Sequence, residues 1–310
     1  MATALRVAYL GPPGTFTEAA TLTLPEAGEA TLDPRPSISD ALDAVRTGAA
    51  DRAVVPLESS IEGSVMLTLD ELAFAAPALT IRAEVLLPIT IALLARTTVA
   101  LSDVRVVVSQ PHAAAQCRGW LQAHLPTAEV RAASSTAEAA RLVADSTEPM
   151  AALGAAVAAG EYGLSVLADA VGDHPDAVTR FVLVGPAAEP PPVATGADRT
   201  SAVAFIGDDH PGALLELLEE FAVRGVNLSR IESRPTKAGL GRYCFFVDCE
   251  GHVSEPRVGE ALHGLKRRCA DVRFLGSYPR GDDAAPGPLA RGASESDFAA
   301  ADAWLRDLRG

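Results

Sequence analysis

The chain has 310 residues, of which 48% are hydrophobic, and a formal net charge of −14 at pH 7. This length suits two or three domains, and the acidic balance argues against nucleic acid as a partner, because no basic patch is visible. No apolar run is long enough to cross a bilayer, and the first residues lead straight into a strand without a signal peptide, so we expect no membrane partner and a cytoplasmic location.

The cysteines and histidines indicate no redox or metal site. The four cysteines lack both C-x-x-C spacing and the density of a disulfide scaffold, so we expect buried free thiols at Cys117, Cys244, Cys249 and Cys269. The six histidines form no H-x-x-x-H or similar pair, and we expect no bound metal.

The chain opens with a strand, a loop and a helix. Residues 5–10 form an apolar strand that ends at "GPPG", and Thr15 with Glu18 makes a T-x-x-E capping box for the helix that follows. A second helix is expected over residues 38–45, followed by a strand and the polar loop "LESSIEGS". The same alternation continues to "VTRFVLVG" at residues 178–185, which predicts an α/β fold of mainly parallel sheets covered on both faces.

The remaining third of the chain has a different order of elements. Residues 186–199 are rich in proline and alanine and read as a linker. Residues 200–279 predict a βαββαβ, ferredoxin-like sandwich with its helices on one sheet face. We expect a disordered tail over 280–310, although its last residues could instead form an amphipathic helix with an apolar face of Phe298, Trp304, Leu305 and Leu308.

Four loops of the α/β region carry groups that suit an anionic ligand. "GPPGTFTE", "PLESSIEGS", "SQPHAAAQ" and "ASSTAEA" each follow a strand and begin a helix with small or hydroxyl residues. Such loops meet at the carboxyl ends of strands, where N–H groups at helix starts attract anions. Thr15 and Ser135 could equally be simple helix caps, and Glu58 a surface carboxylate. Neither G-x-x-x-x-G-K-[ST] nor G-x-G-x-x-G is present, so a nucleotide is not expected.

The strand "VTRFVLVG" begins with two polar side chains. Arg180 could present its guanidinium to a ligand carboxylate, or could form a structural salt bridge. Thr179 could serve as a hydrogen-bond donor in a strongly favourable reaction, or could owe its place to strand propensity alone.

Taken together, residues 5–279 resemble the monofunctional bacterial prephenate dehydratases with a C-terminal ACT regulatory domain. "GPPGTFTEAA", "VVPLESSIEGSV", "EYGL" and "TRFVLVG" resemble the dehydratase motifs, and "HPGALLELL" and "ESRPTKAGLGRYCFFVDCEGH" those of the ACT domain. The resemblance implies a catalytic domain over 4–185 with two lobes, like a periplasmic binding protein. One lobe would comprise about 4–82 with 166–185, and the other 83–165.

The resemblance also implies a carbon–oxygen lyase of phenylalanine biosynthesis that needs no cofactor. Prephenate would lose its ring carboxylate as CO₂ and its ring hydroxyl as water, giving phenylpyruvate. Thr179 would be essential and would hydrogen-bond the departing hydroxyl. By the same resemblance, the substrate site would comprise Arg180, Phe181, Glu58, Ser59, Gly14, Thr15, Ser109, Gln116, Ser135 and Thr136.

Three positions depart from the family pattern. Ser59 stands where asparagine is usual, Gln110 where histidine is usual, and Ala177 where asparagine is frequent. None of them belongs to the Thr-Arg-Phe motif, so the departures concern the surrounding hydrogen bonds.

For the ACT domain, the resemblance implies feedback regulation by L-phenylalanine. The effector would bind where residues 212–215 of one subunit meet residues 232–235 of another, which requires a homodimer or homotetramer. The effector-binding residues would be Gly212, Ala213, Leu214, Leu215, Glu232, Ser233, Arg234 and Pro235. Arogenate dehydratase and a non-catalytic amino-acid-sensing protein are the alternative functions.

Overall fold

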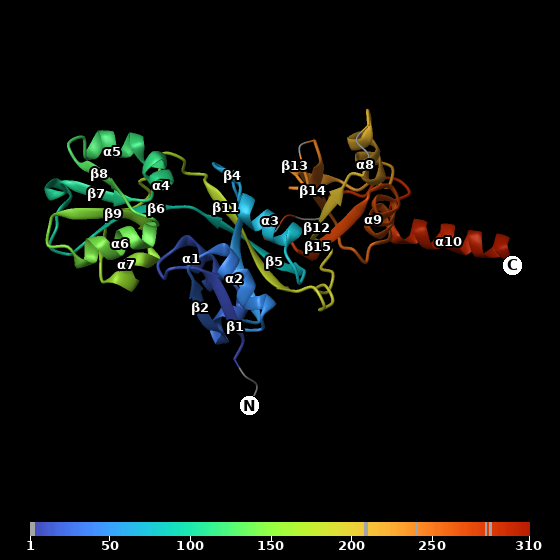
Figure 1. Cartoon of the computed structure of the whole chain (residues 1–310), viewed down its shortest axis with the longest axis horizontal. Coiled ribbons are helices and arrows are strands. Elements are labelled where there is room, and N and C mark those ends of the chain that lie inside the picture. The colour runs from blue at the N-terminus through green and yellow to red at the C-terminus, as the bar shows by residue number, and fades with distance from the viewer. Residues whose placement is uncertain (1–3, 208–209, 240, 283, 285–286) are drawn as a thin grey trace. The chain divides into compact units, whose positions relative to one another are not determined.

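The computed structural model describes residues 4–207, 210–239, 241–282, 284 and 287–310. The chain forms two compact units. The first unit combines Met1–Glu71 with Val85–Pro186, and the second combines Leu72–Glu84 with Ala187–Gly310 (Figure 1). The chain therefore passes from one unit to the other three times.

The first lobe of the first unit is built on a six-stranded sheet of order β2-β1-β3-β11-β5, with β4 paired to β3. Its strands are β1 (Arg6–Leu10), β2 (Thr31–Arg35), β3 (Arg52–Ser59), β4 (Gly63–Ser64), β5 (Leu79–Pro88) and β11 (Val178–Pro186). The accompanying helices are α1 (Phe16–Leu22), the 3₁₀ helix η1 (Pro25–Glu29), α2 (Ile38–Arg46) and α3 (Met66–Phe74). The helix expected over 38–45 is thus present as α2.

The second lobe contains a five-stranded sheet of order β10-β6-β9-β7-β8. Its strands are β6 (Ile91–Ala95), β7 (Val106–Ser109), β8 (Glu129–Ala132), β9 (Met150–Ala155) and β10 (Ser165–Ala168). Its helices are the 3₁₀ helix η2 (Leu101–Asp103), α4 (Pro111–Gln116), α5 (Arg118–His124), α6 (Thr136–Asp145) and α7 (Val157–Tyr162).

The core strand β6 shows why helices cover both faces of this second sheet. All five of its residues are buried, and alternate side chains of a strand point to opposite faces. Ile91, Leu93 and Ala95 pack with residues of α4 and α5, whereas Ala92 and Leu94 pack with residues of α6 and α7.

Two expectations about the first unit need correction. Both sheets are mixed rather than mainly parallel: β1 pairs in parallel with β2 and β3, but β11 runs antiparallel to β3, and β6 antiparallel to β9 and β10. The second sheet also begins and ends later than expected, because β5 stays in the first sheet as far as Pro88 and β10 still pairs with β6. The chain returns to the first sheet at β11, which runs in the opposite direction to its neighbour β3.

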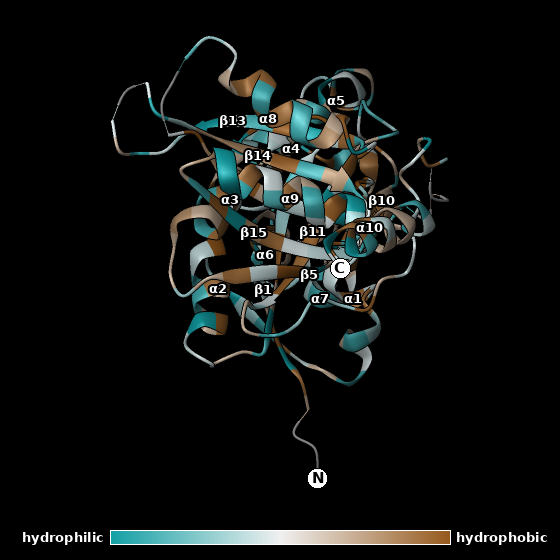
Figure 2. Ribbon diagram, turned by 90° about the vertical axis from the view of Figure 1, so that its right-hand side faces the viewer, coloured by the Kyte–Doolittle hydropathy of each residue, from teal (hydrophilic) through white to brown (hydrophobic). Residues whose placement is uncertain are grey.

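The second unit contains the expected βαββαβ sandwich. Its elements are β12 (Asp198–Phe205), α8 (Ala213–Ala222), β13 (Leu228–Pro235), β14 (Tyr243–Glu250), α9 (Pro256–Arg268) and β15 (Asp271–Pro279). The four strands pair antiparallel in the order β13-β14-β12-β15, so β13 is an edge strand. Helix α8 carries brown hydrophobic and teal hydrophilic residues (Figure 2), and its buried Leu217 and Phe221 pack with α9 residues and the sheet.

The segment Leu72–Glu84, the end of α3 and the start of β5, packs within the second unit. The ring of Phe74 meets that of Phe205 edge-on, with 6.0 Å between centroids, and Arg273 donates a hydrogen bond to the carbonyl of Ala75. Gly276 has a φ of +136°, and a Cβ at this position would lie 2.3 Å from the carbonyl oxygen of Ile81. Only glycine allows β5 to approach β15 this closely.

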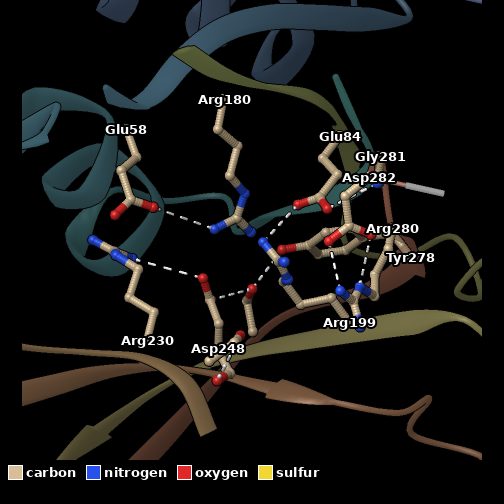
Figure 3. A network of polar contacts seen from close by, with 12 residues as sticks. Glu58, Glu84, Arg180, Arg199, Arg230, Asp248, Tyr278, Arg280, Gly281 and Asp282 are labelled. Atoms are coloured by element: carbon tan, nitrogen blue, oxygen red, sulfur yellow. Dashed lines mark hydrogen bonds and ion pairs between the residues drawn. The ribbon is translucent and has the colours of Figure 1, made fainter. Parts of the chain in front are cut away.

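The buried carboxylate of Glu84 fixes the same segment. Its side chain has no exposed surface, accepts a hydrogen bond of 3.0 Å from Arg199 of β12, and accepts another of 2.9 Å from the N–H of Gly281 (Figure 3). Both partners belong to the second unit. The ion pair therefore joins two segments within that unit.

Of the two forms expected for the last residues of the C-terminal tail, a disordered segment and a helix, the structure has the helix. Residues Glu295–Arg309 form helix α10, and its first turn is closed by a capping box in which Ser294 and Asp297 satisfy each other's backbone N–H groups. Trp304, Leu305 and Leu308 are exposed on it, so the helix is defined by its cap and not by a buried face. No helix among the described residues is long and apolar enough to span a membrane.

Candidate active site

A cavity of about 440 Å³ lies between the two lobes of the first unit. Both lobes contribute to its wall, and its lining is mostly uncharged. The first lobe supplies Phe16, Ser59, Glu62, Gly63, Ser64, Val65, Ile89, Thr179 and Phe181, and the second supplies Ile91, Gln110, His112, Ala113, Gln116 and Thr136. Five of the residues expected in the substrate site, Ser59, Gln116, Thr136, Thr179 and Phe181, are thus brought together.

Strand β11 places Thr179 and Phe181 on the cavity wall. Thr179 is half-buried opposite Ser59 of β3, and Phe181 is only 2% exposed, so its ring is a rigid part of the wall. A register shift in the pairing with β3 follows Arg180, but Thr179 and Phe181 still face the same side, as alternate residues of a strand do. Thr179 and the aromatic residue Phe181 therefore line the same ligand space.

Arg180 does not line this cavity. It lies between Thr179 and Phe181 on β11, and neighbouring residues of a strand point to opposite faces. Its guanidinium is 3.7 Å from the carboxylate of Glu58 on β3, as the dashed line in Figure 3 shows, and its side chain is 5% exposed. Arg180 and Glu58 therefore do not line the cavity that Thr179 lines. Their contact supports the salt-bridge interpretation of Arg180.

The turn after β3 is held in place by two serines. The hydroxyl of Ser59 accepts hydrogen bonds from the N–H groups of Ile61 and Glu62, at 3.2 and 3.3 Å. Ser60 exchanges two bonds with Val178 at the start of β11. Serine at position 59, where the family pattern has asparagine, thus has a structural use here: it fixes the turn that carries Glu62.

Several expected donors are helix caps. Thr15 accepts a bond from the N–H of Glu18 at α1, and Ser135 accepts one from the N–H of Glu138 at α6. Ser109 is buried at the end of β7, and its hydroxyl donates to the carbonyl of Gln110. Both helices contribute their first residue to the cavity wall, Phe16 of α1 and Thr136 of α6.

Gly14 is needed where the lobes approach each other. Its φ is +85°, and a Cβ there would lie 2.9 Å from the ring of Tyr162 on α7 and 3.1 Å from the Cβ of Ala158. The hydroxyl of Tyr162 donates a 2.7 Å hydrogen bond to the carbonyl of Pro13. The "GPPG" and "EYGL" segments, far apart in sequence, therefore meet at one contact between the lobes.

Two ionisable residues of the cavity were missed from the sequence. Glu62 of the β3–β4 turn lies 3.3 Å from Nδ1 of His112, and its other carboxylate oxygen accepts a 3.2 Å bond from Nε2 of Gln116. His112 and Gln116 are four residues apart on α4, the spacing that places two side chains on one helix face. That spacing was the signal available in the sequence.

The cysteines are free thiols, as expected. Cys117, Cys244 and Cys249 are buried and Cys269 is half-buried. Burial raises the pKa of Cys117 to about 12 and that of Cys249 to about 12, which leaves both thiols protonated and unreactive at neutral pH. The described residues contain no group of three or more metal-ligating side chains.

The second unit has a cavity of about 420 Å³ at the start of α8. All four residues of the "GALL" segment line it, and Gly212 has a φ of +100°. The other lining residues are Ile206, Gly207, His210, Gly241, Arg242, Tyr243 and Phe245. The second expected effector segment, Glu232 to Pro235, lies on the edge strand β13 and does not line this cavity.

Comparison with known proteins identifies the family. A family sequence model described as prephenate dehydratase matches residues 7–189, and one described as ACT domain matches residues 201–267. The chain belongs to the prephenate dehydratase family. A curated prephenate dehydratase from Mycobacterium tuberculosis (strain ATCC 25618 / H37Rv) is 50% identical over 314 residues, which cover 98% of this chain and 94% of the relative.

Solved structures of similar proteins agree with this membership. A prephenate dehydratase from Arthrobacter aurescens, crystallised in complex with L-Phe, is 48% identical and superposes with a TM-score of 0.92 over 99% of this chain and all of that one. GqqA, described as a novel type of quorum quenching acylase, is 27% identical with a TM-score of 0.79 and covers 89% of this chain and 98% of its own. A shared fold therefore does not fix the activity by itself, and the residues of the site must support it.

Proposed function

We propose that this protein converts prephenate to phenylpyruvate, CO₂ and water, and that L-phenylalanine regulates it through the second unit. The carrying observation is the pairing of the Thr179 hydroxyl and the Phe181 ring on one wall of a cavity between two lobes, in a chain of the prephenate dehydratase family. The near full-length match to curated prephenate dehydratases supports the same reaction.

The reaction requires little bond-forming chemistry from the protein. The bond between the ring and its carboxylate breaks, the electron pair moves through the ring, and the carbon–oxygen bond of the ring hydroxyl breaks at the opposite carbon. Aromatisation supplies the driving force. The protein must orient an anionic substrate and help hydroxide to leave as water, and such positioned acid assistance contributes typically about 10²–10⁴-fold.

The cavity supplies these two needs with different groups. The hydroxyl of Thr179 donates a hydrogen bond to the departing oxygen. Ser59, Gln116 and Thr136 offer polar groups around the ligand space, and Phe181 with the other apolar lining residues packs against the ring. Because decarboxylation provides the electrons, none of these steps requires an added cofactor.

The effector site of the proposal combines two copies of the chain. The "GALL" cavity of one copy would face the edge strand β13 of another, which carries Glu232, Ser233, Arg234 and Pro235. Pairing of two such edges would extend the sheet and cover the unpaired backbone groups of β13. A homodimer is the smallest assembly that provides this arrangement, and we place the protein in the cytoplasm.

An assay of phenylpyruvate release with and without L-phenylalanine tests both halves of the proposal. We expect product from prephenate and inhibition by the amino acid. Faster turnover of arogenate, followed by formation of its product L-phenylalanine, than of prephenate would identify an arogenate dehydratase. No product from either substrate, with L-phenylalanine still bound, would identify an amino-acid sensor instead.

Two substitutions test the effector site. Gly212→Val adds a β-branched side chain where φ is +100°, a conformation such residues rarely adopt, and so distorts the start of α8. Ser233→Ala removes one hydroxyl from the edge strand. We expect both to raise the L-phenylalanine concentration needed for half-inhibition, with uninhibited turnover unchanged. Inhibition curves identical to the wild type would place the effector elsewhere.

A further inference from the structure

The cavity between the lobes lacks a strong cation, although prephenate carries two carboxylates. Of its lining residues, which all lie in the described part of the chain, only Glu62 and His112 are ionisable. Arg180 faces away from it and pairs with Glu58. A positive charge on the cavity wall can therefore come only from the imidazole of His112.

The imidazole of His112 and the amide of Gln116 both lie next to a single carboxylate, that of Glu62. One oxygen of Glu62 is 3.3 Å from Nδ1 of His112, and the other accepts a 3.2 Å bond from Nε2 of Gln116. The two donors stand on the same face of α4 in the second lobe, whereas Glu62 belongs to the β3–β4 turn of the first lobe. His112 and Gln116 together form a carboxylate-binding site, and the carboxylate of Glu62 occupies it.

This internal contact is weak enough to be exchanged. The side chains of His112 and Glu62 are 67% and 46% exposed, and ion pairs at such exposure contribute little to stability because water screens them. The N–H of Glu62 is bonded to Ser59, so the backbone of the turn stays in place while the side chain moves. A substrate carboxylate can thus displace that of Glu62 without rearranging the fold.

We propose that His112 and Gln116 bind a carboxylate of the substrate, and that Glu62 occupies their donors until the substrate arrives. Gln116 is a substrate-site residue that the resemblance implied, whereas His112 is a binding residue of this chain that the motifs did not indicate. It also restores an imidazole to the loop in which Gln110 replaces the usual histidine, and both residues line the cavity. The inference rests on the proposed reaction.

The charge of His112 makes the proposal testable through pH. Histidine changes charge between about pH 5 and 8, and the one charged group that contacts this imidazole among the described residues is Glu62. A protonated imidazole binds an anion better than a neutral one. We therefore expect KM for prephenate to rise with pH in the wild type.

The experiment measures kcat and KM for prephenate between pH 5.5 and 8.5 in four proteins. In His112→Gln we expect KM to rise about tenfold at low pH and to lose much of its pH dependence, with kcat within about threefold of the wild type. In His112→Arg, which is charged at every pH, we expect KM to stay low up to pH 8.5. His124→Gln is the matched control, because His124 stacks on Trp120 of α5 and does not line the cavity.

The outcomes separate this inference from the proposed reaction. If the wild type releases no phenylpyruvate, the reaction itself is wrong. If the wild type is active but His112→Gln shows the same KM and the same pH profile as His124→Gln, the carboxylate site is wrong and the reaction stands. A fall in kcat at constant KM would also overturn it, because that result indicates a role in the chemical step and not in binding.

Discussion

We expect Thr179→Val to lower kcat for prephenate by at least about 100-fold, with the fold intact. Valine has nearly the shape of threonine and suits a strand equally well, so the pairing of β11 with β3 is preserved. The substitution removes the hydroxyl of a residue that lines the cavity beside Phe181. The departing oxygen then leaves without its hydrogen-bond donor, and the barrier rises.

Thr179→Ser is the matched control for this experiment. Serine keeps a hydroxyl at the same place and loses only a methyl group, so we expect most of the activity to remain. Steady-state phenylpyruvate formation measures both variants, and circular dichroism verifies that both are folded. Turnover of Thr179→Val close to that of the wild type would remove Thr179 from the mechanism.

The second large effect concerns stability. We expect Arg199→Met to destabilise the second unit by about 3–5 kcal/mol, because it removes the cation that donates a hydrogen bond to the buried carboxylate of Glu84. The carboxylate of Glu84 has no exposed surface, and Arg199 is only 12% exposed. Methionine fills a similar volume, so the loss reports the missing charge and not a cavity. Urea denaturation followed by far-UV circular dichroism measures it.

An exposed ion pair of the same unit provides the comparison. Nζ of Lys266 lies 2.6 Å from a carboxylate oxygen of Asp271, a shorter distance than the 3.0 Å between the guanidinium of Arg199 and the carboxylate of Glu84. The side chains of Lys266 and Asp271 are, however, 62% and 58% exposed. We expect Lys266→Met to cost less than about 1 kcal/mol. Equal costs for the two substitutions would show that burial does not decide the strength of these pairs. A chain of two units can unfold in two steps, so each variant is compared at the same transition.

The sequence was sufficient for the order of elements and for five of the fifteen residues that line the cavity. Strand and helix patterns depend on neighbouring residues, so the helix over 38–45 and the βαββαβ order of the second unit could be predicted directly. The loops that begin helices also predicted where a ligand cavity forms. Thr179, Phe181, Ser59, Gln116 and Thr136 all line it.

What could not be predicted depends on partners distant in sequence. Arg180 and Thr179 are adjacent in the motif, and adjacency suggested one shared site. The pleat of β11 turns them to opposite faces, and the guanidinium lies 3.7 Å from the carboxylate of Glu58. Glu62 and His112 are 50 positions apart in the numbering, and no local pattern links them. The mixed strand directions of the sheets also depend on partners distant in sequence, because the direction of β11 is set only when the chain returns to the first lobe.

The placement of Leu72–Glu84 has a consequence for engineering this protein. A regulatory domain joined to an enzyme by one linker can be exchanged by cutting that linker. Here the second unit also contains the end of α3 and half of β5, held by Phe205, Arg199 and Gly281. A chimera joined only at residue 186 would lack these native partners for Phe74 and Glu84. A working exchange must therefore transplant residues 72–84 together with residues 187–310.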